Sequence, residues 1–237
     1  MRLLLLLAML PMAVSAQDLR VLSGGAAKSL VEPMAASFPG GKVEVQFQPM
    51  GKLFESLAQG MNVDLVIVTE EMLPRLKERA QPGARPIARV GIGVAVNEKA
   101  PSPDISTVEA FKRTLLAAKS VVYIDPQVGT SGKHVAEMLE RLGIAREVNA
   151  KARLGSGGYI VEPVGKGEIE LGLHQVSEII PVKGVKLVGE LPRELQKYTV
   201  YVAVPMKSSP TVLAFIDHLT GPQAKSRLAQ AGYTPPE

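Results

Sequence analysis

The sequence predicts an α/β fold built on parallel sheets. Three observations support it: β-rich runs alternate with helical segments along the chain, small residues follow several strands, and no long linker interrupts the pattern. The run from Val63 to Val68 is apolar except for Asp64, as expected of a strand covered on both faces. Hydrophobic residues make up 46% of the 237 residues, enough for a substantial core.

The first sixteen residues have the features of an export signal. Arg2 gives a positive start, an apolar run follows from Leu3 to Leu10, and small residues precede a predicted cleavage site after Ala16. The apolar run is too short to cross a bilayer, which takes about 20 residues. We expect a soluble periplasmic protein that begins at Gln17. N-terminal sequencing of the exported protein tests this, and an intact initiator methionine would contradict it.

The elements of the first half follow in order. A strand at Leu19–Leu22 leads to a helix that ends near Phe38, and the capping-box spacing of Ser29 and Glu32 predicts its start at Ser29. The next elements are a strand at 42–48, a short helix at 53–59 closed by Gly60, the strand at 63–68 and a β-rich run at 89–96.

The second half continues the alternation. Ser106 and Glu109 have capping-box spacing and open a predicted helix through about Lys119. The remaining elements are a strand at 121–124, a helix that ends at Leu142 before Gly143, strands at 169–174, 185–188 and 198–204, and helices that open at Pro210 and near Pro222, the last ending at Gly232. If the chain forms two lobes, the runs 89–96 and 198–204 are the best candidates for crossing between them.

Composition argues against several classes of function. The absence of cysteine excludes thiol catalysis and thiolate metal sites. The net charge of +4 is spread along the chain, and with 4% aromatic residues and no Trp we expect no nucleic-acid partner. His134, His174 and His218 lack metal-ligand spacing and are interpreted as ordinary lobe or surface residues. The glycine needed for a phosphate loop is replaced by Ala27, and no nucleophile elbow is present, so we expect no enzyme, no metal and no cofactor.

Four turns of small residues lie between predicted strands and helices, at 23–27, 49–52, 129–133 and 155–159. In open α/β sheets, ligands bind beyond the carboxyl ends of the strands. Helix N-termini there present unpaired N–H groups and a partial positive charge. The turns therefore predict a site for a small anion that needs no metal. Lys28, Lys52 and Lys133 lie near these turns and are candidates to add positive charge.

The chain resembles the periplasmic molybdate-binding proteins, the substrate-binding components of ABC importers. The resemblance covers essentially the whole mature chain, and residues 219–224 (Leu-Thr-Gly-Pro-Gln-Ala) are its most specific string. Its other strings are 21–27, 60–67, 125–126 with Gly132, and 167–172. It implies a two-lobed type II periplasmic binding protein fold, with a mostly parallel sheet flanked by helices in each lobe and two hinge strands. The expected division is 17–88 with 203–237 in one lobe and 89–202 in the other.

The resemblance also implies where the ligand lies. Ala26 and Met50 stand where the family has hydroxyl residues, Ser131 where it has alanine, Gly157 near its valine, and Gln175 at its tyrosine. The full set of predicted ligand-binding residues is Ser23, Gly24, Gly25, Ala26, Met50, Gly51, Thr130, Ser131, Gly132, Gly157, Gly158, Tyr159 and Gln175.

The function expected from these features is that of a monomeric periplasmic solute-binding protein. It would capture an oxyanion of the molybdate or tungstate type in an interlobe cleft, close by hinge motion and deliver its ligand to the permease of an ABC importer. Two alternatives stay open: a small organic carboxylate as the ligand, and a ligand-sensing module for a membrane receptor.

Overall fold

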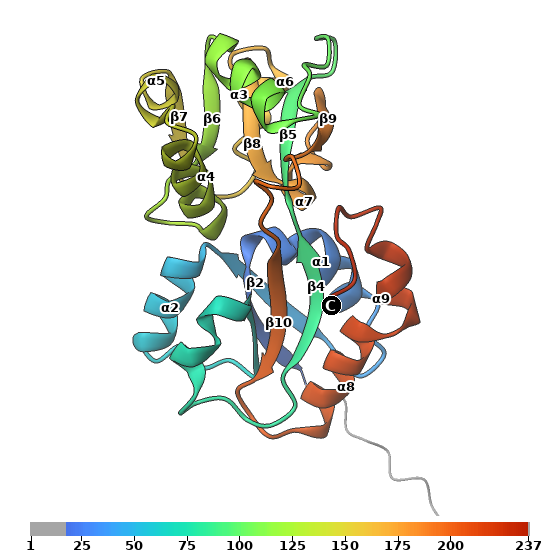
Figure 1. The fold of residues 1–237 in the computed structure, drawn as a ribbon. Coiled ribbons are helices and arrows are strands. Elements are labelled where there is room, and N and C mark those ends of the chain that lie inside the picture. The colour runs from blue at the N-terminus through green and yellow to red at the C-terminus, as the bar shows by residue number, and fades with distance from the viewer. Residues whose placement is uncertain (1–17, 237) are drawn as a thin grey trace, which may run out of the picture.

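In the computed structural model, which describes residues 18–236, the chain forms two α/β lobes, each built on a five-stranded sheet (Figure 1). The predicted export signal lies outside the described residues. Within 18–236, no helix is long and apolar enough to span a bilayer.

The sheet of the first lobe has the strand order β2-β1-β3-β10-β4. Its strands are β1 (Leu19–Gly24), β2 (Val43–Gln48), β3 (Leu65–Thr69), β4 (Arg85–Val90) and β10 (Thr199–Pro205). β1 pairs in parallel with β2 and β3, whereas β10 is antiparallel to both β3 and β4. Four strands therefore run in one direction and one in the other.

The second sheet repeats this arrangement with the order β7-β6-β8-β5-β9. Its strands are β5 (Ile92–Asn97), β6 (Val121–Ile124), β7 (Ala152–Gly155), β8 (Leu171–Gln175) and β9 (Val185–Glu190). β6 pairs in parallel with β7 and β8, and β5 is antiparallel to β8 and β9. The predicted α/β class with mostly parallel sheets is confirmed.

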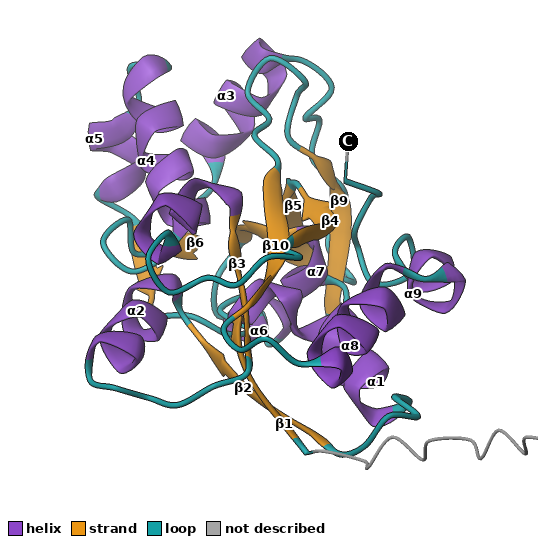
Figure 2. Ribbon diagram, turned by 90° about the horizontal axis from the view of Figure 1, so that it is seen from below, coloured by secondary structure: helices purple, strands orange, loops and turns teal. Residues whose placement is uncertain are grey.

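Helices cover both faces of each sheet, as the buried strands require. In the first lobe they are η1 (Gly25–Ala27), α1 (Lys28–Ala36), α2 (Met50–Ala58), η2 (Glu70–Leu76), α8 (Pro210–Thr220) and α9 (Pro222–Arg227). In the second they are α3 (Val108–Ala117), α4 (Thr130–Arg141), α5 (Ala145–Asn149), α6 (Glu162–Gly165) and α7 (Val176–Ile179). In Figure 2, α2 lies on one side of the first sheet and α1, α8 and α9 lie on the other. The apolar residues between these layers form two clusters in each lobe.

The chain crosses between the lobes twice. The predicted run 89–96 is in fact two strands in different sheets, β4 and β5, which meet at Gly91. The return crossing is at residues 197–198. Gln196 joins the two crossings, since its side chain accepts a hydrogen bond from the Ile92 N–H (3.0 Å) and donates one to the Ile92 carbonyl (2.9 Å).

Sheet membership moves the boundaries between the lobes by a few residues. The expected division assigns 89–90 and 199–202 to the second lobe, but their pairing in β4 and β10 puts them in the first sheet. We use "first lobe" for 18–90 with 199–236, and "second lobe" for 92–196.

The predicted helix start at Ser29 is wrong. α1 begins at Lys28 after the 3-10 turn, and no side chain caps it. The Ser29 hydroxyl instead shares a 2.9 Å hydrogen bond with the Tyr233 hydroxyl, which is 204 residues further along the chain. A tertiary contact has replaced the local one.

The second predicted capping box is also displaced. The Ser106 hydroxyl donates to the Asp104 carboxylate at 2.7 Å. Thr107 is the cap of α3, since its side chain accepts a hydrogen bond from the Ala110 N–H at 3.1 Å. The helix therefore starts at Val108, and its end at Ala117 precedes the expected Lys119 by two residues.

Candidate ligand-binding site

A cavity of about 300 Å³ lies between the two lobes. Its walls include all four of the small-residue turns, and the carboxyl ends of β1 and β2 meet those of β6, β7 and β8 across it. The chain segments that line it are 25–29, 47–50, 128–131, 156–159 and 174–178, with Ile124 and Tyr201; of these segments Ala27 and Val176 do not line it. The predicted cleft is therefore present at the expected edge of both sheets.

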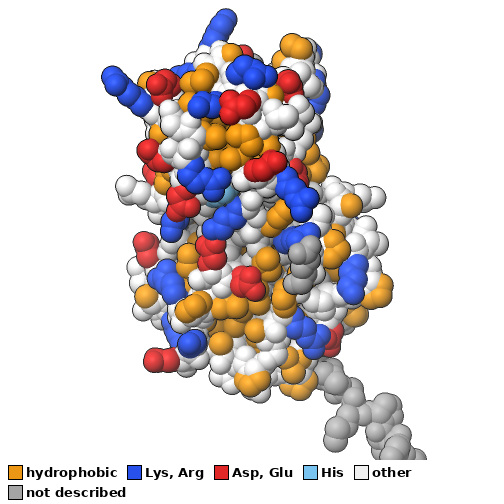
Figure 3. All heavy atoms as spheres, viewed as in Figure 1, with side chains coloured by type: hydrophobic (Ala, Val, Ile, Leu, Met, Phe, Trp, Pro, Cys, Tyr) orange, Lys and Arg blue, Asp and Glu red, His pale blue; other side chains and the backbone are white. Residues whose placement is uncertain are grey.

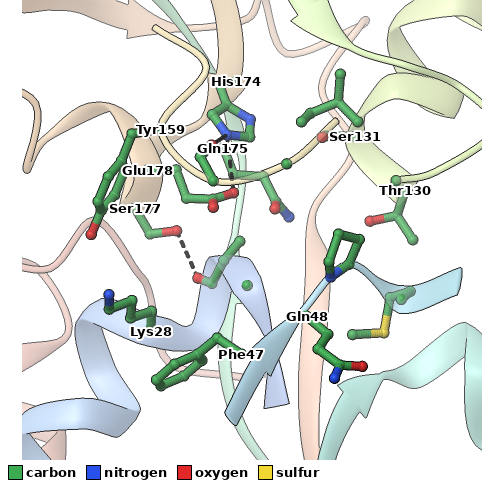
Figure 4. Close-up of a pocket in the computed structure, with 18 of the residues that line it drawn as sticks. Lys28, Phe47, Gln48, Thr130, Ser131, Tyr159, His174, Gln175, Ser177 and Glu178 are labelled. Atoms are coloured by element: carbon green, nitrogen blue, oxygen red, sulfur yellow. Dashed lines mark hydrogen bonds and ion pairs between the residues drawn. The ribbon is translucent and has the colours of Figure 1, made fainter. Parts of the chain in front are cut away.

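The N-terminus of α4 supplies donors from the second lobe. Thr130 and Ser131 are the first two residues of this twelve-residue helix and both line the cavity. The N-cap residue is Gly129, so no side chain caps this helix. The Ser131 hydroxyl has no hydrogen-bond partner within residues 18–236. Figure 4 shows both hydroxyl side chains on the opposite side of the pocket from Lys28 and Phe47. Free hydroxyls beside unpaired N–H groups suit an anionic oxygen.

Apolar side chains form much of the remaining wall. They are Phe47, Pro49 and Met50 from the first lobe and Ile124 and Val128 from the second. Met50 is 7% exposed and packs in the core between α2 and the first sheet. The cavity thus combines donors for an anion with apolar surface that an inorganic oxyanion does not need.

A buried histidine–glutamate pair lies at the end of β8. Nε2 of His174 is 3.1 Å from the Glu178 carboxylate and 3.0 Å from the Gly158 carbonyl (Figure 4). His174 is 1% exposed and Glu178 7%. Burial lowers the pKa of His174, but the charge and hydrogen bond of Glu178 and the Gly158 carbonyl outweigh it, so the net shift is upward. The pair is of a kind that marks functional sites.

Two buried nitrogen atoms of the cavity lining have no hydrogen-bond partner within residues 18–236. They are Nδ1 of His174 and Nε2 of Gln175, whose side chains are 1% and 4% exposed. Buried polar atoms are almost always paired, and each unpaired one costs about 1–3 kcal/mol. Because both residues line the cavity, a bound ligand is the expected hydrogen-bond partner of these two nitrogen atoms.

The lobes are joined beside the cavity by a network of hydroxyl groups. The Ser177 hydroxyl of the second lobe donates to the Ala26 carbonyl of the first at 2.8 Å (Figure 4). The Tyr233 hydroxyl donates to the same carbonyl at 2.5 Å and contacts Ser29 at 2.9 Å. Burial, above all, raises the pKa of Tyr233 to about 12, so its hydroxyl stays neutral at physiological pH.

The structure brings most of the predicted site residues together. Nine of them line the cavity: Gly25, Ala26, Met50, Thr130, Ser131, Gly157, Gly158, Tyr159 and Gln175. The other four do not: Ser23, Gly24, Gly51 and Gly132.

Each of these four has a different place. Ser23 is fully buried, and its hydroxyl donates to the neighbouring Gly24 carbonyl. Gly24 packs against Met50, and a Cβ there would be 2.3 Å from the methionine methyl carbon. Gly51 faces solvent, and Gly132 packs against the backbone at Ile124. Of the three candidate lysines, Lys28 alone lines the cavity.

Sequence reasoning missed several lining residues, of which His174 and Glu178 are the most important. Because His174 has no metal-ligand spacing in the sequence, sequence reasoning assigns it no role at the site. The signal that could have found the pair is its four-residue separation across a strand-to-helix junction, next to the predicted Gln175. Across residues 18–236, no group of three or more His, Asp or Glu side chains could hold a metal ion.

Comparison with known proteins agrees with this architecture. The sequence profile of the bacterial extracellular solute-binding proteins matches residues 19–234. The chain belongs to this family. An aconitate isomerase from a Pseudomonas species is 30% identical over 98% of this chain and 94% of its own length. The molybdate-binding protein ModA of Escherichia coli is 31% identical over 46% of this chain and 44% of its own.

Among solved structures, the periplasmic molybdate-binding protein of Azotobacter vinelandii superposes with a TM-score of 0.75. It covers 92% of this solute-binding protein and 100% of its own chain at 18% identity. The two-lobed type II fold implied by the resemblance is thereby confirmed. The resemblance to molybdate-binding proteins is confirmed as well, at the level of a divergent member of a solute-binding family.

On the side drawn in Figure 3, positive and negative side chains are interspersed over both lobes. That face shows no continuous basic surface of the kind that binds nucleic acid.

Proposed function

We propose that this solute-binding protein captures a small organic carboxylate with more than one carboxyl group and presents it to a membrane permease. The observation that carries the proposal is the cavity itself, with a volume of about 300 Å³ and a mixed lining. That volume falls at the lower end of the range of roughly 300–1,000 Å³ typical of small-molecule sites. A five-atom oxyanion would leave much of that volume empty.

The distribution of polar groups supports a ligand with two or more anionic ends. Thr130 and Ser131 lie on one side of the cavity, and Lys28 lies across it on the other (Figure 4). Phe47 and Met50 add apolar wall suited to a carbon skeleton. The relationship to a protein named for its action on aconitate, an unsaturated tricarboxylate, agrees with this choice.

Molybdate is expected to bind less tightly than a suitable carboxylate. Ala26 and Met50 offer no hydroxyl where the molybdate-binding resemblance has one. Each missing hydrogen bond to a charged group removes about 1.5–3 kcal/mol, tenfold or more in affinity. Titration calorimetry with molybdate, tungstate, citrate and the two aconitate isomers compares the classes directly. Nanomolar affinity for molybdate would overturn the carboxylate proposal.

A thermal-shift screen tests anion binding more broadly. A ligand at 100 times its dissociation constant stabilises the native state by about 2.7 kcal/mol, which is roughly 5–11 °C for a chain of this size. We expect such a shift with one or more organic acids and no requirement for metal. A shift with neutral sugars or cations alone would contradict the proposal.

A second candidate function is isomerisation of the bound carboxylate, and the His174–Glu178 pair favours it. In a 1,3-proton shift, a methylene C–H bond breaks, the double bond moves by one carbon, and a proton is returned to the far carbon. The pair could accept and return that proton, and no cofactor is needed. Incubation with cis-aconitate in D₂O, followed by proton NMR, separates the functions. Formation of the deuterated trans isomer, lost in Glu178→Gln, supports catalysis, whereas unchanged cis-aconitate supports binding alone.

A further inference from the structure

We propose that the cleft takes up one proton when it binds its anion. His174 carries this proton and thereby supplies the positive charge that the second lobe contributes to the cavity lining. The inference rests on the proposed function, namely that an anion binds between the lobes. Proton uptake would make the affinity for the anion depend on pH near neutrality. A site that binds an anion through Lys or Arg keeps its charge in that range.

The fixed charges of the lining are the first step. Among the lining residues within 18–236, Lys28 is a cation and Glu178 an anion, so with a neutral His174 the charges cancel. Lys28 is 41% exposed and lies 3.9 Å from Glu32, which further screens its charge. Glu178 is buried and screened little. A cavity in this state has little attraction for a multiply charged anion.

The hydrogen-bond geometry of His174 is the second step. Both groups that contact Nε2, the Gly158 carbonyl and the Glu178 carboxylate, are acceptors. Nε2 must therefore carry the hydrogen, which leaves Nδ1 as a bare lone pair in the neutral ring. Nδ1 has no partner within residues 18–236. A second proton placed there gives an imidazolium that neutralises Glu178 and adds an N–H donor to the wall.

The other titratable groups near the pair do not compete for this proton. Tyr201 of β10 and Tyr233 of the C-terminal segment lie near Glu178. Burial above all, together with the negative charge of Glu178, raises the pKa of both hydroxyls. Tyr159 and Lys28 line the same cavity from the turn after β7 and from α1. Tyr201 and Tyr233 therefore keep their protons near neutral pH and cannot take up another. The proton that enters with the anion is taken up by the histidine–glutamate pair.

The sign of the pH dependence follows. Because the pKa of His174 is raised, His174 keeps its proton below about pH 6.5, and anion binding there draws no further proton. Above the pKa of the ligand-free state, each anion bound must bring a proton with it. One linked proton weakens the affinity tenfold for each pH unit.

Calorimetric titration of the full chain with trans-aconitate measures this directly. At about two pH units above the pKa of His174 in the ligand-free protein, in buffers of different ionisation enthalpy, we expect uptake approaching one proton, and at about pH 5.5 none. Binding with no dependence on buffer or pH would overturn the inference while leaving the proposed function intact. An absence of binding at both pH values would instead count against the carboxylate proposal.

Three variants assign the proton to its residue. His174→Gln should bind with an affinity that does not change between about pH 6.5 and 8.5. Glu178→Gln should bind more tightly than the wild type at pH 8.5, because the cavity no longer holds a buried negative charge. His134→Gln is the matched control, since His134 is also buried, with Nε2 2.8 Å from the Leu195 carbonyl, but does not line this cavity. Its proton uptake should equal that of the wild type.

A measurement on the ligand-free protein does not depend on the choice of ligand or on the folding of the variants. Nitrogen NMR of ¹⁵N-histidine-labelled protein should show His174 with its proton on Nε2 when neutral and a pKa above that of an ordinary histidine. Retention of the uptake in His174→Gln, or a His174 that stays neutral to pH 5, would overturn the assignment.

Discussion

Replacement of Gly132 with alanine is expected to lower the melting temperature by roughly 6–12 °C, from an overpacking cost of about 3 kcal/mol in a chain of this size. A Cβ at this position would lie 2.1 Å from the Ile124 carbonyl oxygen and 2.9 Å from the Asp125 carbonyl carbon. Both neighbours are backbone atoms of the strand end, so no side-chain rotation relieves the contact. The N-terminus of α4 would be pushed off the sheet, and ligand affinity would fall with stability.

Gly51→Ala is the matched control for this experiment. Both glycines were predicted site residues in the first turn of a helix, but Gly51 is exposed and a Cβ there meets nothing within 4 Å. Alanine is expected to leave the stability unchanged or to raise it by up to about 1 kcal/mol. Equal melting temperatures for the two variants, measured by calorimetry, would contradict the close approach of α4 to β6.

Replacement of Ser131 with alanine is expected to weaken ligand binding roughly tenfold or more, corresponding to about 1.5–3 kcal/mol for a hydrogen bond to a charged group. Ser131 is 6% exposed, lines the cavity and caps nothing, since α4 has no side-chain cap. The stability of the ligand-free protein should therefore change little. Titration calorimetry with the tightest organic acid of the thermal-shift screen, beside apo melting curves, measures both quantities.

Thr107→Ala distinguishes a ligand contact from a helix cap in the same lobe. Thr107 caps α3 through its bond to the Ala110 N–H and lies outside the cavity lining. Its loss should cost about 1 kcal/mol of stability with affinity unchanged. If Ser131→Ala behaved like Thr107→Ala, losing stability but not affinity, Ser131 would have to be removed from the site.

The residues predicted to bind the ligand and the residues that line the cavity differ in a physically consistent way. The position of a residue at the cavity was predictable where backbone geometry alone brings it there, because the turn after a strand in an open sheet lies at the sheet's carboxyl edge, whatever its side chains. Thr130, Ser131 and Gly157 were found on that basis. Prediction failed where the role depends on what packs nearby, as for Gly132, whose requirement for glycine comes from the Ile124 backbone.

The histidine–glutamate pair could not be predicted from the sequence for a related reason. His174 and Glu178 are four residues apart, but one is on a strand and the other in a helix, so local periodicity does not join them. Their burial comes from both lobes. Gly25 of the first lobe lies beside the Glu178 carboxylate, such that a Cβ on it would be 3.6 Å from Oε1. No sequence pattern reports that contact.

The sequence by itself determined the α/β class, the order of strands and helices and the four turns, because each depends on local hydrophobic periodicity and on small residues at strand ends. Tertiary structure alone decided that the run 89–96 divides at Gly91 between two sheets, that Ser29 bonds Tyr233 rather than capping its own helix, and that His174 lies buried against Glu178 at the cleft. Each of these depends on segments far apart in the chain. Their free energies come from burial and pairing that exist only once those distant segments have packed together in the tertiary structure.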